Sequence, residues 1–138
     1  MNFVLWIATG LLALIALIGG ISKTFISKEK LAQSPPGGGW VLDFNVVFLR
    51  FLGILEILAA LGLILPAVVD IFPILVPVTA VCWVLLMIGA IITHLRHGDA
   101  KPVVANIIYL LLAVFIAWGG VSVPCPFQDN IIAHYLLR

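Results

Sequence analysis

The chain has 138 residues, of which 64% are hydrophobic and 9% are charged, and its formal net charge is +1. Soluble domains carry about 45–50% apolar and about 25% charged residues, so this composition excludes an ordinary soluble fold and predicts an integral membrane protein. A nearly neutral chain has no overall field that attracts nucleic acid. The length fits a single membrane domain over residues 1–138, with no room for a second.

Four stretches are long and apolar enough to cross a bilayer. A helix needs about 20 mainly apolar residues to span the hydrocarbon core, where it satisfies its own backbone hydrogen bonds. The expected spans are 3–21, 46–65, 72–93 and 103–121. The predicted fold class is an all-α membrane protein, an antiparallel four-helix transmembrane bundle, because the short second and third connections favour neighbouring antiparallel helices.

The polar loop 22–45 separates the first two spans. Its run of prolines and glycines at 34–39 excludes a continuous helix, while 27–33 can form a short surface helix. Trp40 and Phe44 are expected to be interfacial anchors that lead the chain back into the membrane.

Three smaller expectations concern Pro66, the C-terminal tail and the two cysteines. Pro66 is expected to end the second span. The tail 122–138 is expected to contain a short amphipathic segment. Cys82 and Cys125 lack the paired spacing of a redox or zinc motif, so they are expected to be unpaired thiols without a catalytic role.

Basic residues predict the orientation in the membrane. Six of the seven lie in or beside the first and third loops: Lys23, Lys28, Lys30, Arg50, Arg96 and Lys101. Only Arg138 lies on the other side. Loops 22–45 and 94–102 are therefore expected to be cytoplasmic, with both termini outside.

Each span also carries a row of small or polar residues at helical spacing. Such rows form helix interfaces in lipid, because close packing and interhelical hydrogen bonds replace the hydrophobic effect there. The rows are Thr9, Ala13, Ala16 and Gly20; Gly53, Glu56 and Ala60; Gly89, Ala90, Thr93 and His94; and Asn106, Tyr109, Ala113, Ala117 and Gly120.

Glu56 is the most informative single residue. It lies about 15 Å from the start of its span, near the bilayer centre, where a charged side chain costs about 2.5–3.5 kcal/mol or more. It must therefore be protonated or paired. Arg50 lies about 120° away round the same helix, so direct pairing is not expected. The expected partners come from other helices: Lys23, His94, Asn106 and Tyr109.

Two interpretations of Glu56 remain open. The carboxyl either carries protons or binds a ligand, or it is a buried polar link that fixes the register of the helices. The cations Lys23, Arg50 and Arg96 are expected to extend toward the cytoplasmic headgroups. No metal site is expected, since His94 and His97 lack a set of further ligands.

Several motifs in the spans together carry a family resemblance. They are Gly19-Gly20-Ile21-Ser22-Lys23, Arg50-Phe51-Leu52-Gly53-Ile54-Leu55-Glu56, Leu61-Gly62-Leu63-Ile64-Leu65-Pro66, Thr93-His94-Leu95-Arg96-His97-Gly98 and Pro102 to Asn106. With these motifs, over roughly residues 3–121, the chain resembles the DoxX-like family of small four-span bacterial membrane proteins.

The resemblance implies a multi-pass protein of the bacterial plasma (inner) membrane, accessory to quinone-linked electron transfer. It also implies five positions for a ligand-binding or proton-carrying site: Lys23, Arg50, Glu56, His94 and Asn106. No covalently bound cofactor is expected, because the chain has no ligand set for haem, iron–sulfur or flavin. A quinone is the candidate ligand that the resemblance implies.

Three functions remain open. The first is an accessory or assembly subunit that docks onto another membrane protein and has no catalytic activity of its own. The second is an autonomous protein that binds a quinone-like small molecule around Glu56 and His94. The third is a proton-coupled transporter, which would need a homo-oligomer to supply enough spans.

Overall fold

The structure, a computed structural model, describes residues 2–35, 37–69, 71–72 and 74–122. The four long helices are α1 (Asn2–Phe25), α3 (Val46–Val69), α4 (Leu75–His97) and α5 (Ala100–Ser122). Between α1 and α3 lie the short helix α2 (Lys28–Ala32), which corresponds to the expected surface helix, and the 3-10 helix η1 (Gly38–Asp43). The amphipathic segment and the second cysteine, Cys125, fall in the tail outside the described residues.

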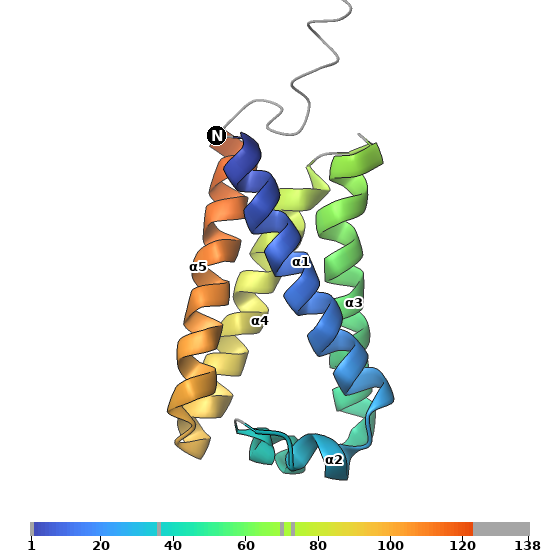
Figure 1. The fold of residues 1–138 in the computed structure, drawn as a ribbon, viewed down its shortest axis with the longest axis vertical. Coiled ribbons are helices and arrows are strands. Elements are labelled where there is room, and N and C mark those ends of the chain that lie inside the picture. The colour runs from blue at the N-terminus through green and yellow to red at the C-terminus, as the bar shows by residue number, and fades with distance from the viewer. Residues whose placement is uncertain (1, 36, 70, 73, 123–138) are drawn as a thin grey trace, which may run out of the picture.

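The helices form two packed pairs. α1 runs along α3 and α4 runs along α5, and the pairs meet through α3 with α4 and α1 with α5. Figure 1 shows the antiparallel bundle, with α2 across one end and the N-terminus at the other. The predicted all-α four-helix bundle is confirmed.

All four long helices are apolar enough to cross a membrane. Their outer faces carry large exposed apolar side chains, such as Val47, Leu85 and Trp118, as expected of a surface in contact with lipid. This chain is a multi-pass membrane protein. Cys82 is a free thiol on the exposed surface.

The predicted small-residue rows hold the first pair together. Thr9, Ala13, Ala16 and Gly20 are buried in α1, and Gly53, Glu56 and Ala60 are buried in α3. In α4 the expected row is only partly packed, because Gly89 is exposed.

Gly20 and Gly53 form the closest crossing of α1 and α3. A Cβ on Gly20 would lie 2.7 Å from the carbonyl oxygen of Gly53 and 2.9 Å from the backbone nitrogen of Ile57. A Cβ on Gly53 would lie 2.8 Å from the carbonyl oxygen of Gly20. Both contacts are with backbone, so only glycine lets the helices approach this closely.

Two expected helix boundaries were wrong. Pro66 does not end the second span: it lies inside α3, buried, three residues before its last residue. A proline so near the C-terminus removes one hydrogen bond of the final turn, and the helix tolerates that loss. The third span does not begin at residue 72, because Phe72 has a φ of 52°, in the left-handed region. α4 begins at Leu75.

The connection between α1 and α3 is folded onto the end of the bundle. The Lys28 ammonium donates to the carbonyl oxygens of Leu42, at 3.1 Å, and Phe44, at 2.6 Å. The His97 Nε2 atom on α4 lies 2.7 Å from the Asp43 Oδ2 atom at the end of η1. These contacts hold η1 and Phe44 against α2 and α4, where they form part of the candidate site.

Candidate functional site

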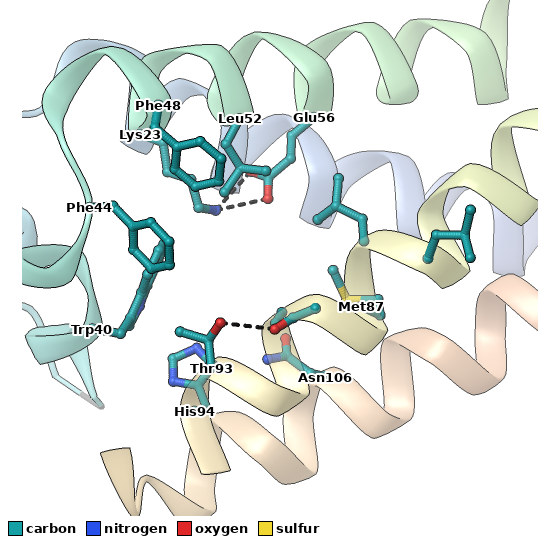
Figure 2. Close-up of a pocket in the computed structure, with 14 residues that line it drawn as sticks. Lys23, Trp40, Phe44, Phe48, Leu52, Glu56, Met87, Thr93, His94 and Asn106 are labelled. Atoms are coloured by element: carbon teal, nitrogen blue, oxygen red, sulfur yellow. Dashed lines mark hydrogen bonds and ion pairs between the residues drawn. The ribbon is translucent and has the colours of Figure 1, made fainter. Parts of the chain in front are cut away.

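A cavity of about 380 Å³ lies between the two helix pairs near the α2 end of the bundle. Figure 2 shows its principal side chains, which come from α1, η1, α3, α4 and α5. One wall is aromatic, one carries an ion pair, and the facing wall combines apolar and uncharged polar groups. The labelled lining residues are Lys23, Trp40, Phe44, Phe48, Leu52, Glu56, Met87, Thr93, His94 and Asn106.

The ion pair joins Lys23 of α1 to Glu56 of α3. The Lys23 ammonium donates to both carboxylate oxygens, at 2.9 Å and 2.8 Å, and the Glu56 side chain is only 5% exposed. Of the four partners expected for Glu56, the structure selects Lys23. The prediction that Lys23 extends toward the headgroups was therefore wrong, because the opposite charge at Glu56 holds its ammonium inside the bundle.

Glycines in both helices position this ion pair. Lys23 follows Gly20 by three residues and Glu56 follows Gly53 by three, so in these antiparallel helices they lie about one turn from the crossing point in opposite directions. The Lys23 side chain runs back across the crossing: a Cβ on Gly53 would lie 3.0 Å from its Cβ, and a Cβ on Gly19 would lie 3.4 Å from its Nζ atom. Gly19 provides the space, since a Cβ there would lie 2.9 Å from the Glu56 Oε2 atom. The glycines thus set both the separation of the helices and the room for the charges.

Three aromatic rings spaced four residues apart form one wall. Phe44 and Phe48 stack with ring centroids 4.9 Å apart, and Trp40 meets Phe44 edge-on at 5.9 Å. Trp40 also meets the ring of His94 edge-on at 5.7 Å. Trp40 and Phe44 were expected to be interfacial anchors, but both line the cavity. Phe48 was not predicted from the sequence, although its spacing of four residues from Phe44 could have indicated it.

The facing wall carries three hydrogen-bonding side chains, those of Thr93, His94 and Asn106. The Nδ1 atom of His94 is buried and has no hydrogen-bond partner among the described residues; the Asp99 Oδ2 atom, at 3.6 Å, lies beyond hydrogen-bond reach. Within the same part of the chain, the Asn106 amide also has no hydrogen-bond partner. Thr93 is satisfied, because its hydroxyl donates to the carbonyl oxygen of Gly89 at 2.9 Å.

Two further cavities adjoin the ion pair. One of about 340 Å³ shares Lys23 and Glu56 with the first and is also lined by Trp83 and Tyr109. Another, of about 240 Å³, lies under the α1–α3 connection and includes Lys23 and His94. Tyr109, an expected partner of Glu56, therefore lines the neighbouring cavity.

The structure gathers four of the five predicted site residues around the first cavity. Lys23, Glu56, His94 and Asn106 line it together, although they come from all four long helices. Arg50 does not join them. It lies on the exposed side of α3 and lines a separate, smaller cavity.

The model of the DoxX-like family matches residues 7–116. The chain belongs to the DoxX-like family. The matched segment contains every residue that lines the first cavity, from Lys23 to Asn106. Comparison with curated proteins and with solved structures finds no match.

In this DoxX-like protein the site can hold a neutral ligand through hydrogen bonds. Within the described ranges, no three side chains of His, Cys, Asp or Glu gather closely enough to hold a metal ion. The available groups are the Lys23 ammonium, the His94 ring and the Asn106 amide, facing an aromatic wall. An apolar cavity with a few convergent polar groups is the usual form of a small-molecule site.

Proposed function

We propose that this DoxX-like protein binds a lipid-soluble, ring-bearing small molecule of the quinone type inside its helix bundle. The observation that supports the proposal best is the combination of an aromatic wall and convergent polar groups in one intramembrane cavity. A volume of about 380 Å³ falls within the range of about 300–1,000 Å³ for small-molecule sites.

The chemistry of a quinone matches the two walls. Its planar ring can stack against Phe44 and Phe48, whose rings already lie parallel to within 20°. Its carbonyl oxygens accept hydrogen bonds, which the Asn106 amide and a protonated His94 nitrogen can donate. Because Lys23 neutralises Glu56, the cavity presents a dipole with no net charge, and this favours a neutral ligand over an ion.

The rim of the cavity gives a route from the lipid. Phe48 and Leu85 line the cavity and are also 41% and 66% exposed on the outer surface of the bundle. Gly89 lies on the same rim, and a Cβ there would meet nothing within 4 Å. We therefore place the entrance between α3 and α4, where a ligand dissolved in the bilayer can enter sideways and leave its tail in the lipid.

Replacing Gly89 with phenylalanine tests this site. The new ring would fill the entrance, and we expect the affinity for a short-tailed quinone to fall by about tenfold or more, equivalent to about 1.4 kcal/mol. Binding is measured on purified protein in mild detergent, through the quenching of tryptophan fluorescence by the quinone.

Gly10→Phe is the matched control, because a Cβ on Gly10 would also meet nothing within 4 Å, yet Gly10 lines none of the cavities described above. Its affinity should equal that of the unmodified protein. Equal binding by both variants, or no saturable binding by the unmodified protein, would contradict the proposal.

The role as an accessory subunit of quinone-linked electron transfer stays a prediction from the family. The cavity is compatible with it, because a subunit that holds a quinone can present it to a redox partner. No redox centre of this chain's own is part of the proposal.

We further propose a bacterial inner-membrane location with the α2 end of the bundle facing the cytoplasm. That end carries Lys28, Lys30, Arg96 and Lys101, as the positive-inside rule requires. With the C-terminus outside, alkaline phosphatase fused after Arg138 is expected to be active. Green fluorescent protein fused at the same place is expected to be dark. The opposite pattern would reverse the orientation.

A further inference from the structure

A separate cavity of about 180 Å³ lies at the α2 end of the bundle, between the end of α1, the helix α2 and the start of α3. Its polar lining includes Ser27, Lys28, Glu29 and Arg50, and Val46 contributes to its apolar side. It shares Lys23 with the first cavity but none of that cavity's other lining residues, so a ligand bound here does not require the proposed function.

The cavity carries uncompensated positive charge. In the part of the chain that the structure describes, Lys28 donates only to two backbone carbonyls, which are neutral acceptors, and an ammonium has a third hydrogen to donate. Arg50 has no hydrogen-bond or ion-pair partner among the described residues. Lys23 also lines the cavity, but Glu56 neutralises it. Two cations therefore face one carboxylate, that of Glu29.

The surroundings of this cavity suit a phospholipid. Large apolar side chains stand exposed beside it: Phe25 at 77%, Ile26 at 44% and Val47 at 77%. Phe25 ends α1, Ile26 follows it and Val47 lies in the first turn of α3, so we expect them near the boundary between acyl chains and headgroups. Basic pockets between helices at this depth recognise anionic headgroups.

We propose that Arg50 and Lys28 bind the phosphate of an anionic phospholipid at this cavity. The guanidinium of Arg50 can make two parallel hydrogen bonds to phosphate oxygens, and the free N–H of Lys28 adds a third. The Ser27 hydroxyl accepts weakly, at 3.5 Å, from the Lys30 backbone N–H, so its own hydrogen is available to the same phosphate. Phe25 and Val47 then lie along the acyl chains.

The test is a titration of purified protein in an uncharged detergent, with thermal unfolding as the readout. Phosphatidylglycerol is expected to raise the unfolding temperature in a saturable way, while phosphatidylcholine has little effect. Arg50→Gln should weaken the apparent affinity for phosphatidylglycerol by about tenfold or more, because a charge-assisted hydrogen-bond pair is lost. Glu29→Gln should strengthen it.

Arg96→Gln is the matched control, since Arg96 is an exposed arginine at the same end of the bundle that does not line this cavity. Equal weakening by Arg50→Gln and Arg96→Gln would overturn the proposal in favour of diffuse attraction to the basic end. Inorganic phosphate distinguishes a lipid headgroup from a free anion as the ligand. If phosphate alone stabilised the protein as much as phosphatidylglycerol at the same concentration, the site would belong to a free anion and the lipid assignment would be overturned.

Discussion

Lys23→Met is expected to lower the free energy of unfolding by about 3 to 5 kcal/mol. The substitution removes the ammonium that donates two hydrogen bonds to Glu56, whose side chain is 5% exposed. Removing one partner of a buried ion pair costs about this much, because the remaining charge has neither water nor a counter-charge. Reversible unfolding of the protein in mixed micelles of mild detergent and dodecyl sulfate measures the effect.

Two further variants separate the ion pair from other roles of Lys23. Lys30→Met should change stability by less than about 0.5 kcal/mol, because Lys30 is exposed and its ammonium has no partner in the part of the chain that the structure describes. Lys23→Met combined with Glu56→Leu should recover most of the loss, since two apolar residues can replace a buried pair. A double variant as unstable as Lys23→Met would show that the lysine stem, and not the charge pair, holds α1 to α3.

Gly20→Leu is expected to separate α1 from α3 and to destabilise the bundle by about 3 kcal/mol, the upper end of the usual range for overpacking. Its Cβ alone would lie 2.7 Å from the carbonyl oxygen of Gly53 and 2.9 Å from the backbone nitrogen of Ile57. Neither atom can move without moving α3. The shift would also separate Lys23 from Glu56, because both lie about one turn from the crossing point.

The control for Gly20→Leu is Gly10→Leu on the same helix, where a Cβ meets nothing within 4 Å. We expect this variant to unfold within about 0.5 kcal/mol of the unmodified protein, because the leucine enters open space. Unfolding in the same mixed micelles compares the two. Equal stability of the two variants would mean that α1 and α3 do not cross at Gly20.

Much of the fold could be predicted because lipid imposes simple rules. Long apolar runs must be helices, so the four spans were evident from the sequence, and a carboxylate at Glu56 needed a partner from another helix. Four residues remained candidates for the partner of Glu56, because the sequence does not say which helices are neighbours. The Gly20–Gly53 crossing decides it, by placing Lys23 within hydrogen-bond distance of Glu56.

The α1–α3 connection was the least predictable part of the site. Trp40 and Phe44 follow a stretch of prolines and glycines, and interfacial aromatic residues look the same in a sequence as residues that line a cavity. Whether the side chains of Trp40 and Phe44 point into the bundle or toward lipid depends on tertiary contacts. One of these joins Asp43 to His97, which is 54 residues away in the chain. Arg50 was grouped with Glu56 by motif, but six residues along a helix place the two side chains on different faces.

The Lys23–Glu56 pair also has a consequence for how the chain enters the membrane. α3 by itself is a segment with a bare carboxylate near its middle, and such a segment inserts at a cost of about 2.5–3.5 kcal/mol or more. Its counter-ion is supplied 33 residues earlier in the chain, by α1, which leaves the ribosome first. Until α3 arrives, Lys23 lies close enough to the end of α1 for its stem to reach the headgroups. We therefore expect α3 to be more stable as a transmembrane segment once α1 is in place, a dependence that the hydropathy of α3 alone does not reveal.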